Sequence, residues 1–246
     1  MSLCCLITGA SSGIGQATAK YYADQGWTVY AVARSVEKLQ KLATIPGIIA
    51  LPIDLTDTQA IINSANDLKT KGIKLDLMLL NAGTCEYVSA QDLDLDAFHR
   101  TFAINFHANV AAIKYFLPIL LLAKQPQLAV VSSMAHFFPF TRSEAYGASK
   151  AALSYFVDSL RVDLAETNIE ICLIEPGFVD TPLTEKNDFN MPFLLSVDQA
   201  VQRIYQGLAQ HKLRIRFPAR LSLMLKFMAC LPYTMRCRLA VKVASK

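Results

Sequence analysis

Short apolar runs alternate with longer amphipathic segments along most of the chain, and this order restricts the fold more than any other feature. Each run is short enough to be a buried strand, and the segments between them have the periodicity of helices. Strands that alternate with helices form a parallel sheet with helices on both faces. We therefore predict an α/β fold with strands at Leu3–Thr8, Thr28–Ala33, Ile48–Ile53, Leu75–Leu80, Leu128–Ser132, Ile169–Ile174 and Arg214–Phe217.

Helices are predicted between these runs at Gly15–Gln25, Val36–Thr44, Asp57–Thr70, Leu95–Lys124, Glu144–Thr167 and Val197–Ala209. The apolar run Tyr115–Ala123 is too short to span a bilayer and is predicted to lie in a core helix. The stretch Ala219–Ala244 is rich in Leu, Met and Arg, and Pro232 divides it into two short predicted helices. No repeat or linker interrupts residues 1–246, so they are predicted to form one domain.

The positive charge of the chain is concentrated at its C-terminal end. The formal net charge is +4, yet residues 212–246 contain nine basic residues and no acidic one, so the rest of the chain has a net charge of −5. No recognised nucleic-acid-binding module accompanies this charge, and we expect no nucleic-acid partner. Hydrophobic residues make up 53% of the chain and charged residues 18%, which argues against intrinsic disorder.

The six cysteines include no CxxC pair, and no cluster of His and Cys has the spacing of zinc ligands. Buried free thiols in a reducing cytoplasm are the expected state of these side chains. The apolar residues 3–8 are too short for a secretory signal, and no basic segment precedes them. We therefore expect a cytoplasmic protein without a metal site.

A glycine-rich turn with the spacing GxxxGxG, residues 9–15, joins the first predicted strand to the first predicted helix. Glycines let the backbone turn sharply and approach a bulky anion. The helix N-terminus then offers unpaired N–H groups to a diphosphate. Placed between a strand and a helix, this turn predicts a dinucleotide site.

The second predicted strand ends at Ala33, and Arg34 and Ser35 follow it without an acidic residue. An acid at this place often holds the ribose hydroxyls of NAD. A guanidinium group instead suits a 2′-phosphate, because it can donate two parallel hydrogen bonds. The sequence therefore favours NADP(H) over NAD(H), with the alternative that Arg34 is only a solvated residue at a strand end.

A tyrosine and a lysine four residues apart, Tyr146 and Lys150, share one face of a predicted helix. The pKa of a tyrosine hydroxyl is ~10, too high for acid–base chemistry at neutral pH, and a nearby ammonium group lowers it. Such pairs are also common on ordinary helix surfaces. Ser133, at the end of the preceding predicted strand, favours the catalytic interpretation.

These motifs occur together in one known family. Along the chain they are Thr8-Gly9-x-x-x-Gly13-x-Gly15, Asp54-Leu55, Asn81-Ala82-Gly83, Asn105, Ser133, Tyr146-x-x-x-Lys150, and Pro176-Gly177 with Thr181. The chain resembles the short-chain dehydrogenase/reductase family over nearly its whole length. The resemblance implies a Rossmann-like, doubly wound sheet with strand order 3-2-1-4-5-6-7. It also implies hydride transfer between a nicotinamide and a carbonyl or secondary alcohol.

The same resemblance implies a role for each motif. Tyr146 is expected to be the general acid in reduction and the base in oxidation, and Ser133 to bind the substrate oxygen. Lys150 is expected to tune Tyr146 and bind the nicotinamide ribose, while Asn105 holds a water in a proton relay. The expected cofactor-binding residues are Gly9, Ser11, Ser12, Gly13, Ile14, Gly15, Arg34, Ser35, Asp54, Leu55, Asn81, Ala82, Gly83, Tyr146, Lys150, Pro176, Gly177, Val179 and Thr181.

The substrate side of the site is predicted to be apolar. Aromatic and aliphatic side chains are frequent at Phe178, in the segment 137–140 and in a substrate loop at residues 182–196. This favours an aliphatic, aromatic or steroid-like substrate over a sugar, with the alternative that many of these residues are ordinary core. His136 stands where many family members have glycine; it is either a pocket residue or, as we favour, a loop residue without a role.

Three interpretations compete for the basic, apolar extension at residues 219–246. We place a lid or subunit contact beside the active site first, an interfacial segment on an anionic membrane second, and a solvated helical face third. Two alternatives to a cytoplasmic NADP(H) oxidoreductase also remain. One is a membrane-peripheral reductase of lipid, retinoid or steroid carbonyls, and the other is a cofactor-binding regulator or scaffold without turnover. The resemblance further implies a homodimer or homotetramer through helices near 97–122 and 144–167.

Overall fold

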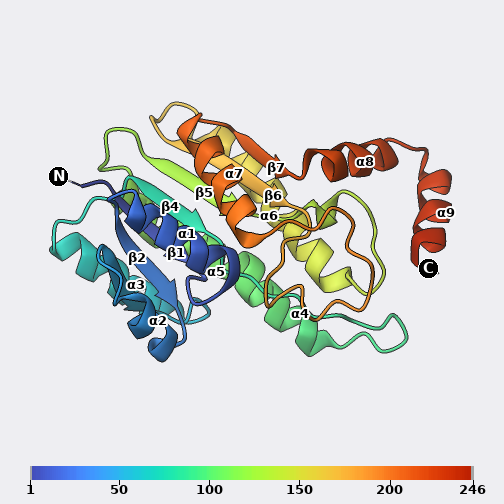
Figure 1. Ribbon diagram of the computed structural model, residues 1–246, viewed down its shortest axis with the longest axis horizontal. Coiled ribbons are helices and arrows are strands. Elements are labelled where there is room, and N and C mark those ends of the chain that lie inside the picture. Colours follow the sequence, from blue (N-terminus) through green and yellow to red (C-terminus); the bar gives the residue numbers. More distant parts are fainter. Residues whose placement is uncertain (1, 245–246) are drawn as a thin grey trace.

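A seven-stranded parallel sheet forms the centre of the fold (Figure 1), and the computed structural model describes residues 2–244 of the chain. The strands cross the sheet in the order β3-β2-β1-β4-β5-β6-β7, and every pairing is parallel. The predicted sheet and its strand order are confirmed. The strands are β1 (Cys4–Thr8), β2 (Thr28–Ala33), β3 (Ile48–Pro52), β4 (Leu77–Leu80), β5 (Gln127–Val131), β6 (Glu170–Pro176) and β7 (Arg214–Phe217).

Helices cover both faces of this sheet (Figure 1). One face packs against α1, α2 and α7, and the other packs against α3, α5 and α6. Each set buries its apolar side chains in a separate core, which is the doubly wound arrangement that the sequence predicts. The helices are α1 (Gly13–Asp24), α2 (Val36–Leu42), α3 (Thr58–Thr70), α5 (Ala108–Leu120), α6 (Glu144–Asp163) and α7 (Val197–Ala209).

Strand β4 shows why the strands appear in the sequence as continuous apolar runs. Leu77 and Leu79 point into the core beside α1 and α7, whereas Met78 and Leu80 point into the core beside α3 and α5. All four side chains are buried. A strand covered on both sides has no solvent-facing positions, so it needs no alternation of polar residues.

The long helix predicted for Leu95–Lys124 is interrupted by one wide turn. α4 (Leu95–Phe102) continues through a π-helical segment, Ala103–His107, into α5. Within this turn, the side-chain amide of Asn109 donates a hydrogen bond of 2.9 Å to the backbone carbonyl of Asn105. Such π segments occur frequently at functional sites, and this one carries Asn105.

Two further helices, α8 (Ala219–Ala229) and α9 (Tyr233–Ala244), follow β7 and extend beyond the edge of the sheet (Figure 1). They are separated at Pro232, as the sequence predicts. α8 packs through Leu221 and Leu225 into a small apolar cluster. Among the described residues, no helix is both long and apolar enough to cross a membrane.

All six cysteines are unpaired. Cys5 and Cys172 are buried in strands, and burial raises the pKa of each thiol. Cys230 is exposed at the end of α8, so the expectation of buried thiols is wrong at this position. Within residues 2–244, no group of three or more His, Cys, Asp or Glu side chains is arranged to hold a metal ion.

Truncating a side chain at the centre of the sheet tests this packing. Leu79 is fully buried in β4 between Ile7 of β1 and Ala129 of β5. Leu79→Ala is expected to lower the free energy of unfolding by about 2–5 kcal/mol, because it removes buried surface and leaves a cavity. Urea denaturation measures the change. The exposed Leu213→Ala is the control, and equal losses in the two variants would contradict the assigned core.

Candidate active site

A cleft of about 290 Å³ lies where the strands end at their carboxyl edge. Ligands bind at this edge in open α/β sheets. The cleft is lined by predicted residues from the turns after β1, β2, β3, β4 and β6, namely Gly9, Ser11, Ser12, Gly13, Ile14, Arg34, Leu55, Asn81, Ala82, Gly83 and Thr181. The motifs do not predict five further lining residues, Ala33, Ile53, Ile104, Pro182 and Leu183.

The other predicted cofactor-binding residues do not line the cleft, and for three of them the contacts explain why. Ser35 caps α2 by accepting a hydrogen bond from the backbone of Lys38. Asp54 accepts two hydrogen bonds from Thr56, at 2.9 and 2.7 Å. Gly15 packs against the backbone of Gly9 and the side chain of Asn81. The remaining five are Tyr146, Lys150, Pro176, Gly177 and Val179.

The glycine-rich turn needs glycine for two different reasons. Gly9 and Gly13 have φ values of +69° and +52°, which L side chains rarely adopt. A Cβ atom on Gly15 would lie 2.3 Å from the carbonyl oxygen of Gly9, so helix α1 can start this close to the turn only without a side chain. Ser12 precedes α1 and makes no capping hydrogen bond with its side chain. The first N–H groups of α1 therefore keep their capacity to bind an anion.

A buried threonine joins the turn after β1 to the turn after β4. The Thr8 hydroxyl accepts hydrogen bonds from the backbone N–H groups of Asn81 and Ala82, at 2.9 and 3.0 Å. The Asn81 side chain donates back to the Thr8 carbonyl at 3.1 Å. These bonds hold the two turns together as one wall of the cleft. Thr181 lies on the other side of Gly13, because a Cβ added to Gly13 would stand 3.3 Å from the Thr181 side chain.

Arg34 is exposed at the cleft and directly follows β2. Its charge acts on Asp54, the first acid after β3. Burial raises the pKa of Asp54, but hydrogen bonds from Thr56 and the positive charge of Arg34 outweigh it and hold the pKa below its usual value. The cleft therefore has a guanidinium group beside the end of β2, where a carboxylate is absent.

Ser133, Tyr146 and Lys150 meet beside the inner end of the cleft. Ser133 follows β5, while Tyr146 and Lys150 lie one turn apart on α6. The Lys150 ammonium group donates to the carbonyl of Val131 at 2.9 Å and lies 5.9 Å from the centre of the Tyr146 ring. The Ser132 hydroxyl donates to the Lys150 carbonyl at 3.0 Å, which fastens this part of α6 to the end of β5.

Burial controls the protonation of this group. It raises the pKa of Tyr146 to about 12, and a hydrogen bond with Ser133 acts in the opposite direction. It lowers the pKa of Lys150 to about 8, and the nearby Cys85 opposes this. Desolvation is thus the largest influence on the pKa of Tyr146, and the Lys150 ammonium group is directed towards Val131; that Lys150 lowers this pKa stays a prediction.

Asn105 connects the π-helical turn to α6, close to Tyr146 and Lys150. Its side chain is fully buried, accepts a hydrogen bond from the backbone of Thr84 at 2.8 Å and donates one to the Ser149 hydroxyl at 2.9 Å. A Cβ on Gly83 would lie 3.1 Å from Asn105 Oδ1 and 3.4 Å from Lys150 Nζ. Gly83 also lines the cleft, so the predicted cofactor and catalytic residues form one continuous site.

Comparison with known proteins agrees with this geometry. A family profile described as short chain dehydrogenase matches residues 4–191. The chain belongs to the short-chain dehydrogenase family.

Members of the short-chain dehydrogenase family resemble this chain in sequence and in fold. An uncharacterized oxidoreductase of Myxococcus xanthus is 34% identical over 232 residues, which cover 92% of each chain. An NADPH-dependent 1-acyldihydroxyacetone phosphate reductase of Schizosaccharomyces pombe is 34% identical over 184 residues, which cover 74% of this chain and 61% of that protein. A short chain dehydrogenase from Burkholderia cenocepacia, solved in complex with NADP, has a TM-score of 0.85 at 21% identity and covers 97% of each chain.

This short-chain dehydrogenase has a buried ionic network beside the segment that follows Ser133, the predicted catalytic serine. Glu175, near the end of β6, is fully buried. It is hydrogen-bonded to His136 at 2.8 Å and to Arg216 of β7 at 2.5 Å. The Arg216 guanidinium also lies 5.1 Å from the centre of the Phe137 ring. His136 is thus not a loop residue without a role, because it joins the segment after Ser133 to β6 and β7.

One feature of the sequence indicates that Glu175 needs a buried partner. Glu175 is an acid that directly follows the apolar run Ile171–Ile174 of β6, and a buried carboxylate needs paired charges or hydrogen bonds. Burial raises its pKa, but the hydrogen bonds from His136 and Arg216, with the charges of Arg216 and Arg214, bring the pKa below the usual value. Its partners were not predictable, because they lie far away along the chain.

The predicted substrate loop, residues 182–196, is bonded to the segments after β4 and before α6. Arg142, before α6, forms an ion pair with Asp188 in this loop and stacks over the ring of Tyr87 at 5.1 Å. The Tyr87 hydroxyl donates a hydrogen bond to the side chain of Asn187. Phe189 packs edge to face against Tyr87 and close to Phe178. Tyr87, which no motif predicts, therefore joins Phe178 in an aromatic wall.

The Glu175 network makes stability depend on pH. Glu175→Gln is expected to lower the free energy of unfolding by about 3 kcal/mol near pH 7, because it leaves the buried Arg216 charge without its partner. The folded-state pKa of Glu175 lies below the unfolded value of about 4.3. Its contribution is therefore complete above that value and is lost as the pH falls through the folded-state pKa.

Urea denaturation at neutral and acidic pH measures this effect. The stability difference between wild type and Glu175→Gln is expected to shrink at acidic pH. Glu37→Gln, on the exposed surface of α2, is the matched control and should show little difference at either pH. A difference for Glu175→Gln that is the same at both pH values would contradict the network.

Proposed function

We propose that this oxidoreductase is an NADP(H)-dependent enzyme that transfers a hydride between the nicotinamide and a carbonyl or secondary alcohol of an apolar substrate. The observation that carries the proposal is that Ser133, Tyr146 and Lys150 lie together next to a glycine-walled cleft, beside its lining residue Gly83. A binding or scaffold protein would need the cleft alone. The buried catalytic group beside it favours turnover.

The cleft fits a dinucleotide in shape and charge. Gly9, Gly13 and Gly15 form a cradle that side chains would fill, and the open N-terminus of α1 suits a diphosphate. Thr181 faces the cradle from the other side. The bound nicotinamide would supply or accept the hydride, which no side chain can do. Gly177, directly after β6, is proposed to lie beside that ring, and its lack of a side chain lets Leu221 of α8 pack 2.5 Å from where a Cβ would stand.

Tyr146 is the proposed proton donor and acceptor. A pKa of about 12 keeps its hydroxyl protonated at neutral pH, which is the form that protonates the substrate oxygen during reduction. Ser133 is the second donor to that oxygen and stabilises its negative charge. Lys150, with a pKa of about 8, is mostly charged at neutral pH and places a positive charge beside the phenol. Asn105 positions this group through Ser149 and Thr84.

The preference for NADP(H) rests on Arg34. It lines the cleft after β2, where a guanidinium can bind a 2′-phosphate and where a carboxylate would repel it. The name of the Schizosaccharomyces pombe relative, an NADPH-dependent reductase, supports the same choice. That name also describes an acylated ketone, which agrees with the aromatic wall of Tyr87, Phe178 and Phe189.

A homo-oligomer is proposed through α4–α5 and α6. Tyr155 and Val162 are large side chains that α6 exposes to solvent, and Leu122 is exposed just after α5. Contiguous exposed apolar side chains mark interaction surfaces. The unpaired cysteines support a cytoplasmic, reducing location for this assembly.

The role of Tyr146 is tested by removing one oxygen atom. Tyr146→Phe is expected to reduce kcat by about 10²- to 10⁴-fold, because no other group protonates the substrate oxygen. Turnover of a panel of apolar ketones and alcohols with NADPH and NADP⁺ measures this. NADPH binding should persist, and Tyr155→Phe, on the exposed side of the same helix, should keep its activity. Equal turnover by Tyr146→Phe and wild type would contradict the proposed mechanism.

Cofactor choice is tested at Arg34. Arg34→Ala is expected to lower the ratio of kcat/KM for NADPH to kcat/KM for NADH by about 10- to 100-fold, because it removes charge-assisted hydrogen bonds to the 2′-phosphate. The two cofactors are compared with one substrate. Lys38→Ala, on the neighbouring helix α2, is the control. A wild-type enzyme that uses NADH more efficiently than NADPH overturns the assignment of Arg34.

A further inference from the structure

One face of α8 is apolar and exposed although its opposite face is already packed. Leu221 and Leu225 point into the cluster with Met134 and Phe138. Leu223 and Phe227, on the other side, are 69% and 71% exposed. A surface helix of a globular protein has one apolar stripe directed at the core. α8 has a second stripe that folding of the chain leaves in water.

The spacing of the exposed residues makes them one surface. Arg220, Leu223, Met224 and Phe227 stand at positions i, i+3, i+4 and i+7, so they share a single face of the helix. Lys226 is exposed at the side of this face. We call these five residues the α8 patch. Large apolar side chains with basic residues at their border are typical of helices that lie in a membrane interface.

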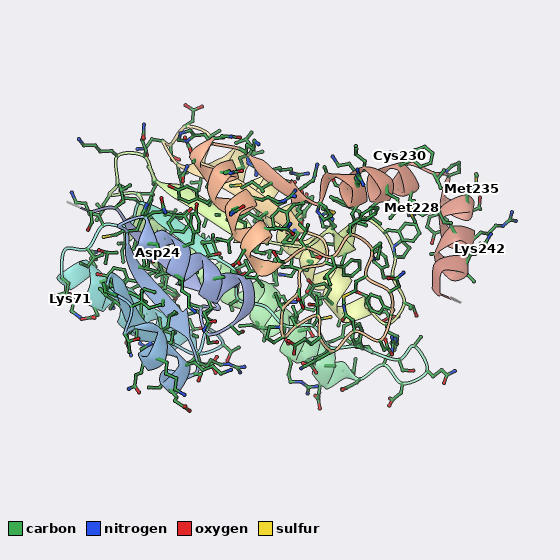
Figure 2. All side chains as sticks on the ribbon, viewed as in Figure 1. Asp24, Lys71, Met228, Cys230, Met235 and Lys242 are labelled. Carbon is green, nitrogen blue, oxygen red and sulfur yellow. The ribbon has the colours of Figure 1, made fainter. Side chains whose placement is uncertain are left out.

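The charge of the surrounding chain has one sign. No acidic residue occurs between positions 212 and 246. Arg214 and Arg216 are paired with Asp158 and Glu175 and so contribute little outward charge. Within residues 2–244, no salt bridge involves Arg220, Lys226 or Arg238, whose charges therefore remain available. Figure 2 shows α8 and α9, with Cys230, Met235 and Lys242 labelled, at the far end of the molecule from α2 and α3.

We propose that the α8 patch binds the surface of a membrane that contains anionic lipids. The apolar side chains would enter the interface between headgroups and acyl chains, and Arg220 and Lys226 would contact the phosphates of the headgroups. A second copy of the chain, joined patch to patch by twofold symmetry, would instead bring these basic residues against each other. Charge complementarity thus favours an anionic lipid surface over a symmetric dimer.

Docking through this patch would bring the bilayer to the substrate side of the enzyme. A Cβ on Gly177 would lie 2.5 Å from Leu221 Cδ2, so the inner face of α8 touches the backbone beside the proposed nicotinamide position. Phe178 packs into the same cluster as Leu221 and Leu225. A helix with one face on lipid and the other on the active-site wall gives an apolar substrate a short path from the membrane.

Vesicle sedimentation of the full-length protein tests the proposal. Vesicles of phosphatidylcholine mixed with phosphatidylglycerol are expected to bind the protein, and vesicles of phosphatidylcholine alone are expected to bind it at least about tenfold more weakly. Added salt should weaken the binding to the mixed vesicles. Equal binding to both compositions, or no binding to either, would overturn the proposal.

Paired variants separate the apolar and the basic contributions. Leu223→Ser/Phe227→Ser and Arg220→Glu/Lys226→Glu are each expected to weaken binding to the mixed vesicles by about tenfold or more. Val36→Ser/Ile49→Ser and Lys38→Glu/Lys69→Glu change exposed residues on α2, β3 and α3, at the other end of the molecule (Figure 1), by the same chemistry and should bind as wild type does. Patch variants that bind as tightly as these controls would contradict the assigned surface.

Two further measurements distinguish the other occupants and the enzyme itself. Analytical ultracentrifugation without lipid shows whether the Leu223→Ser/Phe227→Ser variant loses self-association; if it does and vesicle binding is unchanged, the patch is a contact between copies and the proposal is wrong. Turnover of a water-soluble carbonyl should be the same in the patch variants and in wild type, which also shows that they fold. Failure of lipid binding therefore leaves the proposed reaction untouched, and the reverse is also true.

Discussion

Burial of both faces of the parallel sheet is the constraint on which the rest of the structure depends. Each central strand is apolar on both sides, so polar chemistry is confined to the ends of the strands. The glycine-rich turn, Asn81, Ser133 and Thr181 follow β1, β4, β5 and β6, and all lie at the carboxyl edge. The hydroxyl of Thr8 shows how closely this edge is organised, because one side chain holds two of the turns.

The same burial sets the electrostatics of the site. Desolvation raises the pKa of Tyr146 and lowers that of Lys150, so each group is shifted towards its neutral form. Glu175 is buried as deeply, yet its pKa falls, because His136 and Arg216 both bond to its carboxylate. The difference lies in the partners: Lys150 bonds to a neutral carbonyl of Val131, whereas Glu175 has a cation beside it.

Local patterns in the sequence predict the sheet and the glycine-rich turn, because strands, helices and glycine turns each depend on neighbouring residues. The strand order and the rest of the predicted cleft lining come from the resemblance to the family. They do not predict contacts between distant segments. Glu175 meets His136 and Arg216 across 39 and 41 residues, and Tyr87 meets Asn187 across 100. The π-helical turn at Asn105 is missed for the same reason, since the bonds of its side chain reach Thr84 and Ser149. The desolvation that raises the pKa of Tyr146 also depends on packing in three dimensions, which the spacing of residues along the sequence does not reveal.

The C-terminal helix α8 has apolar side chains on two faces, one packed against the site and one exposed to solvent. The inner face of α8 closes the wall behind Gly177 and Phe178, and its apolar residues there are explained by packing. Leu223 and Phe227 on the outer face bury little within the chain, so the hydrophobic effect gives them little share in folding. Single exposed apolar residues are ordinary, but the row of them on α8 lies beside Arg220 and Lys226, and an apolar, negatively charged surface that covers it would bury the apolar side chains and pair the charges.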